Sequence, residues 1–190
     1  MSIGKLSGGH QAAVMVMAMS TNDENGNVLV TGSKDHYIKV FGVPEYAAGV
    51  HTPKFSLDPP HYDGIQSLAI HGNSLFSGSR DTCIKKWDLA EKKLKFSMNQ
   101  AHKDWVEALQ LLPEQNCLLS GGRDGYLKVW NCDNCALVGE IRAHSSPINA
   151  IATNSSAIFT ASNDQTIGVW KPRNNLSALV MDAGEDERIA

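Results

Sequence analysis

The sequence lacks a long apolar run and an excess of charge of either sign. No segment approaches the roughly 18 apolar residues that a membrane-spanning helix needs, so no membrane insertion is expected. The 17 basic and 20 acidic residues give a net charge of −3, which favours neither nucleic acid nor a membrane surface as a partner. Any charged binding surface must therefore be found in local patches.

Motifs for nucleotide hydrolysis and for coiled coils are also missing. The chain has no G-x-x-x-x-G-K-[ST] phosphate loop and no long heptad run, so these residues are not expected to hydrolyse ATP or to form a coiled coil. No segment of ten or more residues shows a 3.6-residue apolar period. Helix should therefore be nearly absent.

Cysteines are few and show no pattern of a complete metal site. Cys132 and Cys135 have the spacing of half a zinc site, but no second cysteine pair is present to complete a tetrahedron. Cys83 and Cys117 lie apart from them in a chain with no clear export signal, so all four thiols are expected to be reduced. We predict a turn between two outer strands at 132–135, and no metal or other cofactor.

One set of residues occurs four times: a His, a Ser or Thr, an Asp, and an aromatic residue six positions after the Asp. The four sets are His10, Thr31, Asp35 and Phe41; His61, Ser77, Asp81 and Trp87; His102, Ser120, Asp124 and Trp130; and His144, Thr160, Asp164 and Trp170. The Asp residues are 46, 43 and 40 residues apart, in or near the roughly 40–45 residues of a four-stranded propeller blade.

Ser, His and Asp together also suggest the triad of a hydrolase, in which a base takes the hydroxyl proton and a carboxylate orients the base. An enzyme needs one such group, whereas this set recurs four times in register with the apolar pattern. The repetition favours a structural hydrogen-bond network in each blade, in which the His donates to a buried Asp.

Each repeat is predicted to form three strands after its His, with a fourth strand before the next His. The first strands are 12–19, 65–70, 106–111 and 148–152, and the turns that follow them are 25–26, 72–73, 113–116 and 154–156. The run 12–19 follows Lys5 and faintly resembles a signal peptide, but its place after His10 favours a strand.

Two positions depart from the repeat. Phe41 replaces the tryptophan in the first set, so that network lacks an indole donor and should be the weakest. Lys86 stands where the other repeats have Val40, Val129 and Val169, at a strand position that faces a neighbouring blade. We expect its side chain to extend to an edge of the sheet rather than to make a special contact.

The Gly9-His10 pair, the Trp87-Asp88 dipeptide and the spacing from Asp81 to Trp87 resemble WD40 repeats over roughly residues 8–171. Loop sequences narrow the resemblance to the C-terminal WD40 domain of kinesin-4 motors. They are TGSKDHY at 31–37, PPHYDGI at 59–65, FSGSRD at 76–81, AHKDWV at 101–106 and SPINAI at 146–151.

This resemblance implies an all-β WD40 propeller with four of the usual seven blades, at about 8–58, 59–100, 101–142 and 143–173 within residues 1–173. Residues 174–190 are expected to hold a possible outer strand, Leu176–Met181, and an acidic tail. The missing upstream blades would be partners in the same ring. A motor domain and a coiled coil would lie further upstream in the parent polypeptide.

The expected function is non-catalytic protein binding, as the cargo-binding or tubulin- and microtubule-binding tail of a cytoplasmic, cytoskeleton-associated kinesin-like protein. A WD40 adaptor of a ubiquitin-ligase or trafficking complex is an alternative, and a propeller hydrolase is the least favoured. In a WD40 blade the residue before the Asp lies on the face around the central channel. Those residues are Lys34, Arg80, Arg123 and Asn163. The three basic ones, with two nearby aromatic residues, are the candidate partner site: Lys34, Arg80, Arg123, Tyr62 and Trp105. The alternative is that these side chains only face solvent at the rim or pair with local carboxylates such as Asp104.

Overall fold

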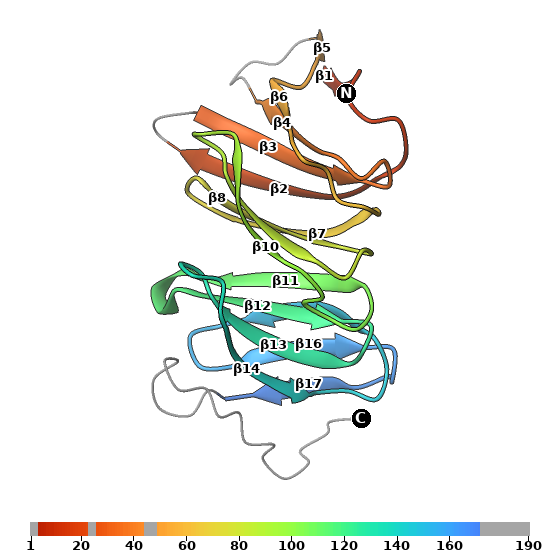
Figure 1. Cartoon of the computed structure of the whole chain (residues 1–190), viewed down its shortest axis with the longest axis vertical. Coiled ribbons are helices and arrows are strands. Elements are labelled where there is room, and N and C mark those ends of the chain that lie inside the picture. The colour runs from red at the N-terminus through yellow and green to blue at the C-terminus, as the bar shows by residue number, and fades with distance from the viewer. Residues whose placement is uncertain (1–3, 23–25, 44–48, 172–190) are drawn as a thin grey trace.

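A computed structural model describes residues 4–22, 26–43 and 49–171, and it is built almost entirely of β-strands (Figure 1). Three four-stranded sheets and one three-stranded sheet follow one another along the chain. Their strands are β2 (Val14–Asn22), β3 (Gly26–Ser33), β4 (Ile38–Gly42) and β6 (Phe55–Leu57); β7 (Ile65–His71), β8 (Ser74–Ser79), β9 (Ile84–Asp88) and β10 (Lys93–Met98); β11 (Val106–Leu112), β12 (Cys117–Gly122), β13 (Tyr126–Asn131) and β14 (Leu137–Arg142); and β15 (Ile148–Thr153), β16 (Ile158–Ser162) and β17 (Ile167–Trp170).

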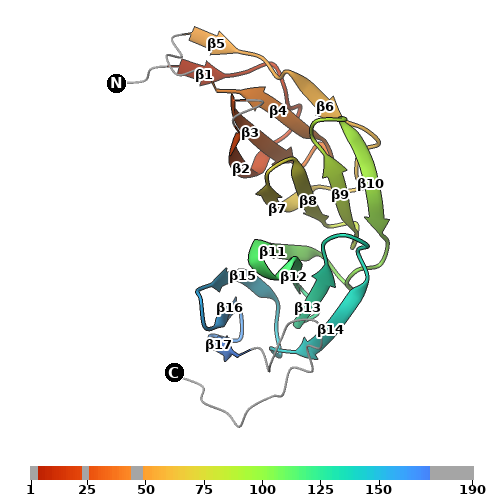
Figure 2. The ribbon, with the colours of Figure 1, turned by 90° about the vertical axis from the view of Figure 1, so that its left-hand side faces the viewer.

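Each sheet is an antiparallel meander, and its strands lie in chain order from the inside of the molecule to the outside. Strands β2, β7, β11 and β15 line the concave side of the arrangement, while β6, β10 and β14 form its convex side (Figure 2). The sheets are thus the blades of a WD40-type propeller, and the predicted all-β class is confirmed. We call them blades 1 to 4 in chain order.

The predicted strand order within a repeat is confirmed, since the fourth strands β6, β10 and β14 each precede the next repeat's histidine. Gly72 and Asn73 form the tight connection between β7 and β8, and Gly72 adopts a φ of 55°, which glycine tolerates without steric cost. The 3₁₀ turn Pro113–Gln115 lies at another predicted turn. Asn25 and the predicted strand 176–181 lie outside the described residues.

A short parallel pair at the N-terminal end was not predicted. Strand β1 (Gly4–Leu6) pairs in parallel with β5 (Gly49–His51), which the chain reaches only after completing three strands of blade 1. The pair adds an element beyond the four repeated sheets (Figure 1). Its residues carry no repeated pattern, so the repeats gave no reason to expect it.

The hydrophobic core is divided among the blade interfaces. One cluster joins Val30 and Val40 of blade 1 to Leu75 and Trp87 of blade 2. Two further clusters join blade 2 to blade 3 and blade 3 to blade 4 in the same way. Blades 2 and 3 therefore bury one sheet face against the blade before them and the other against the blade after them, whereas blades 1 and 4 each bury one face in this way.

The four blades form an open arc, with blades 1 and 4 at its opposite ends (Figure 2). Met17 and Met19 of β2 are 71% and 61% exposed. They occupy the strand positions at which Leu68 and Ile70 of β7 pack against the preceding blade. The outward face of blade 1 is thus an apolar blade-packing face without a neighbouring blade.

The prediction for Lys86 is wrong. Its side chain does not extend to a sheet edge but lies at the interface of blades 2 and 3, where Nζ donates a hydrogen bond of 2.7 Å to the carbonyl oxygen of Cys132. The ammonium also lies 5.9 Å from the Phe76 ring centroid and 5.7 Å from that of Phe96. A carbonyl on the neighbouring blade accepts a hydrogen bond from the ammonium group, and two aromatic rings lie beside it, so the side chain can be accommodated at the interface.

Cys132 and Cys135 flank the turn between β13 and β14, as predicted. Burial raises the pKa of Cys132 to about 12 and also raises that of Cys135, so both thiols are protonated near neutral pH. Among residues 4–22, 26–43 and 49–171, no group of three His, Cys, Asp or Glu side chains is arranged to hold a metal ion. The same ranges contain no helix that is long and apolar enough to cross a membrane.

Candidate functional site

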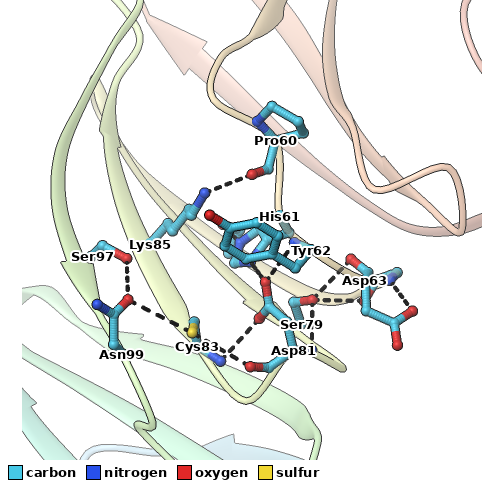
Figure 3. Close-up of polar contacts among 12 residues, drawn as sticks. Pro60, His61, Tyr62, Asp63, Ser79, Asp81, Cys83, Lys85, Ser97 and Asn99 are labelled. Atoms are coloured by element: carbon cyan, nitrogen blue, oxygen red, sulfur yellow. Dashed lines mark hydrogen bonds and ion pairs between the residues drawn. The ribbon is translucent and has the colours of Figure 1, made fainter.

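The repeated His, Ser or Thr, Asp and Trp form a continuous hydrogen-bond relay within a blade. In blade 2, His61 Nδ1 lies 2.7 Å from Asp81 Oδ2 (Figure 3). His61 Nε2 lies 2.8 Å from Ser77 Oγ. Trp87 Nε1 donates to the same Ser77 oxygen at 2.9 Å. A neutral His61 with its proton on Nδ1 satisfies every group: the indole donates to the hydroxyl, the hydroxyl to the imidazole, and the imidazole to the carboxylate.

The same relay is present in blades 3 and 4, with equivalent distances. His102 lies 3.0 Å from Asp124 and 2.7 Å from Ser120, whose oxygen accepts from Trp130 at 2.8 Å. In the fourth blade the contacts of His144 with Asp164 and Thr160 are 2.9 and 2.7 Å, and Trp170 donates to Thr160 at 2.9 Å.

Blade 1 has the relay without its first donor. His10 lies 2.9 Å from Asp35 and 2.7 Å from Thr31, but the position of the indole holds Phe41. The Thr31 hydroxyl instead lies 3.4 Å from the carbonyl oxygen of Lys39. Its oxygen therefore accepts no indole hydrogen bond, in contrast to the hydroxyls of the other three blades.

Electrostatics keeps the Asp residues ionised. Burial on its own would raise the pKa of Asp81, but hydrogen bonds from His61 and from the amides of Tyr62 and Cys83 lower it to about 2. At Asp124 burial would again raise the pKa, but His102 and two backbone amides lower it to about 2. Each carboxylate thus joins the loop before β7 or β11 to the turn after β8 or β12.

The buried hydroxyls are unsuitable as nucleophiles. Ser77, Ser120 and Thr160 have no exposed surface, so a substrate cannot reach them without opening the blade. Each hydroxyl oxygen also accepts an indole hydrogen bond, which reduces its electron density. In blades 2 to 4 the geometry thus supports a structural network, because the hydroxyls are closed off from solvent.

On the face that carries the Asp turns, two arginines share one indole ring. The Arg80 guanidinium carbon lies 4.1 Å from the centroid of the Trp105 ring, and that of Arg123 lies 4.2 Å from it. Arg80 follows β8 in blade 2, whereas Trp105 precedes β11 and Arg123 follows β12 in blade 3. The structure thus places these three predicted residues together at a blade interface.

Two residues that the sequence analysis missed complete this cluster. Arg80 Nε donates to Gln66 Oε1 at 3.2 Å, and Gln66 Nε2 donates to Glu107 Oε2 at 3.0 Å. Glu107 Oε1 lies 3.9 Å from Arg123 Nε. We call Gln66, Arg80, Trp105, Glu107 and Arg123 the rim cluster.

Of the other predicted rim residues, Lys34 lies close to the rim cluster and Asn163 lies in blade 4. Lys34 and the Arg80 side chain both lie beside Gly64. A Cβ atom placed on Gly64 would be 3.3 Å from Lys34 Cα and 3.8 Å from Arg80 Cδ. Asn163 is instead engaged in blade 4, where its Oδ1 accepts from Asn149 Nδ2 at 2.6 Å. The predicted row therefore extends over blades 1 to 3, and the Asn163 amide oxygen is already bonded within blade 4.

Tyr62 is 89% exposed and projects from the loop before β7 (Figure 3). Its amide donates to Asp81 at 2.9 Å. Lys85 holds the preceding residues, since its Nζ donates to the carbonyl oxygens of Pro59 and Pro60 at 3.1 and 2.8 Å. Two internal contacts thus fix the backbone that presents this free aromatic ring.

A repeated four-stranded blade, a His–Ser/Thr–Asp relay and an open rim together define a propeller scaffold of the kind that presents loops to other molecules. The family model "WD domain, G-beta repeat" matches residues 2–42, 52–88, 92–131 and 135–171. The chain belongs to this WD40 family.

Curated relatives include kinesin-like proteins. Kinesin-like protein KIF21A of Homo sapiens is 50% identical over 184 residues, which cover 97% of this chain and 11% of that protein. Kinesin-like protein KIF21B of Mus musculus is 51% identical over 168 residues, which cover 88% and 10%. The resemblance indicated by the loop sequences is thus confirmed for the WD40 region. This chain spans only about a tenth of these relatives' length.

Solved structures agree on the fold. The WD40 repeats of RRP9 superpose with a TM-score of 0.76 at 23% identity, over 95% of this chain and 54% of that chain. The computationally designed Ika4 protein superposes with a TM-score of 0.75 at 25% identity, over 90% and 98%. Both similarities support the propeller architecture.

Proposed function

We propose that this WD40 region is the non-catalytic, partner-binding part of a cytoskeleton-associated kinesin-like protein, and that its rim binds an acidic protein segment. The observation that carries this proposal is the stacking of Arg80 and Arg123 on Trp105. Arginine and tryptophan are enriched among the residues that dominate binding energy at interfaces. Kinesin-like relatives make the acidic tails of tubulin the first candidate for this segment.

Contacts within the rim neutralise only part of the positive charge of the two arginines. Arg80 bonds a neutral amide, and the separation of 3.9 Å between Arg123 and Glu107 exceeds a direct hydrogen bond. Asp104, a nearby carboxylate that could have neutralised an arginine, accepts instead from the Trp105 amide at 2.7 Å. Lys34 and Tyr62, which are both exposed, extend the surface toward blade 1.

Microtubule co-sedimentation of the complete WD40 domain, without the upstream motor region, tests the proposal. The double variant Arg80→Glu/Arg123→Glu should lower binding at least tenfold, because it places negative charge opposite an acidic segment. Wild-type binding should also weaken as salt rises from about 0.1 M to 0.5 M, since the Debye length shortens from about 10 Å.

A matched control carries the same change of charge elsewhere. Lys5→Glu/Lys93→Glu alters two exposed lysines outside the rim cluster and should leave binding near the wild-type level. Binding that is unaffected by both the rim reversal and the salt would exclude this face. Equal losses in the rim and control variants would show that only overall charge matters.

A further inference from the structure

A cavity of about 270 Å³ lies between blades 1 and 2. Its lining includes Val40 of β4, Phe55 of β6 and the connection Gly72–Asn73 between β7 and β8. That connection is at the end of the strands opposite to the turn that holds Asp81, because β7 and β8 are antiparallel. The cavity therefore opens away from the rim cluster and is a separate feature of the molecule.

The cavity corresponds to a site that a lysine side chain occupies at the next interface. Val40 pairs with Phe55 across β4 and β6, just as Lys86 pairs with Phe96 across β9 and β10. Lys86 lies between two phenylalanine rings and donates to the carbonyl oxygen of Cys132. Valine is too short to make the corresponding contacts, so space remains between blades 1 and 2.

The cavity is lined by apolar side chains and by two lysines, together with Gly72 and Asn73. Val28, Val40 and Leu89 are buried and line the interior. Lys54 and Lys92 lie at the opening and are exposed, and Lys92 Nζ lies 4.9 Å from the Phe55 ring centroid. Within the described part of the chain, neither ammonium is ion-paired with a carboxylate.

We propose that this cavity binds an extended protein segment that places one apolar side chain, aromatic or aliphatic, between the blades and an adjacent Asp or Glu against Lys54 and Lys92. The volume suits such a side chain, because an apolar cavity of about 150 Å³ already holds benzene. Two ammonium groups that have no carboxylate partner among the described residues, beside a largely apolar pocket, favour a carboxylate next to the anchor. This second site is independent of the rim cluster and of the partner proposed for it.

Fluorescence anisotropy with labelled hexapeptides tests this proposal on the full protein. The probe Gly-Ser-Trp-Asp-Glu-Gly should bind at least tenfold more tightly than Gly-Ser-Trp-Lys-Lys-Gly or Gly-Ser-Gly-Asp-Glu-Gly, since each of these lacks one required feature. Val40→Lys should lower the affinity at least tenfold, because it introduces the side chain that fills the equivalent site in the next interface.

A surface variant covers the case in which Val40→Lys fails to fold. Lys54→Glu/Lys92→Glu changes only exposed side chains and should also weaken the first probe at least tenfold, while Lys5→Glu/Lys103→Glu should not. The rim variant Arg80→Glu/Arg123→Glu should bind the probe as the wild type does. The proposal is overturned if the wild type does not distinguish the three peptides at millimolar concentration, or if the charge reversal at the opening leaves binding unchanged.

Discussion

At the scale of single residues, the partly buried Asp of each blade connects two loops, and in blades 2 to 4 it belongs to a relay of four side chains. Asp81 accepts from His61 and from the amides of Tyr62 and Cys83, so its removal would leave the buried His61 imidazole and two backbone amides without their acceptor. An unsatisfied buried polar group costs about 1–3 kcal/mol, more than the net gain of about 1 kcal/mol from a typical hydrogen bond. The relay therefore stabilises the blade chiefly because removing any one of its side chains leaves another without a hydrogen-bond partner.

We predict that Asp81→Ala, Asp124→Ala and Asp164→Ala each lower the free energy of unfolding by roughly 1–3 kcal/mol. Asp35→Ala should cost least, because Phe41 leaves the first relay without an indole donor. Urea denaturation of the complete WD40 domain measures these differences. A loss at Asp35 as large as at the other three sites would contradict the ranking.

Acid should destabilise the protein in two steps. The pKa of His61 is lowered by burial from 6.5, so the folded state favours neutral His61 and loses stability as the pH falls below about 6.5. The pKa values of Asp81 and Asp124 are about 2 in the folded state, against 3.8 without the fold. The stability that these carboxylates contribute is present above about pH 4 and is lost as the pH falls toward 2.

Melting temperatures recorded from pH 7 to pH 2 measure both steps. Each carboxylate should contribute to the lower step, because its pKa of about 2 in the folded state lies below its ordinary value. Asp81→Asn should reduce that step, because the amide does not titrate. A profile that stays flat down to pH 3 would contradict the prediction.

At the scale of strands, a β-bulge recurs at the start of each inner strand. The pairing register shifts between the first and third residues of β2, β7, β11 and β15. The extra residues include Gln66 and Glu107, the two members of the rim cluster that the sequence analysis missed. Bulges redirect side chains, so this local irregularity provides a reason why an amide and a carboxylate meet two arginines there.

The lysine at the interface of blades 2 and 3 gives a prediction at the same scale. Lys86→Val should destabilise the protein by about 1–3 kcal/mol, because it loses the hydrogen bond to Cys132 and leaves a cavity. Lys86→Met retains most of the aliphatic volume and should cost less. Thermal denaturation of both variants provides the comparison, and a Met variant as unstable as the Val variant would assign the whole effect to the hydrogen bond.

At the scale of the whole molecule, the arc ends in exposed apolar faces. Met17 and Met19 lie on blade 1, and Ile167 and Val169 of β17 are 55% and 46% exposed on blade 4. Each propeller blade normally buries both faces against neighbours. A larger ring that includes upstream blades therefore remains our inference for the complete domain.

Residues 1–190 expressed alone should consequently aggregate or form oligomers, because the end blades expose apolar faces and strand edges. Met17→Lys/Met19→Lys should reduce this association, and added upstream blades should yield a monomeric domain. Size-exclusion chromatography with light scattering tests both statements. A stable, cooperative monomer of 20.6 kDa from the wild-type chain would refute them.

The sequence by itself determined the blade count, the strand order within a blade and the members of the relay, because these depend on a short-range pattern repeated four times. His61, Ser77, Asp81 and Trp87 lie within one blade, so their spacing alone brings them together. The tertiary structure decided which side chains meet between blades. Lys86 reaches Cys132, and Arg80 reaches Trp105, only because the rotation of one blade against the next sets those distances. The cavity beside Val40 also depends on how two blades pack. Blades 1 and 2 have Val40 where the interface of blades 2 and 3 has Lys86, and the shorter side chain leaves space between them.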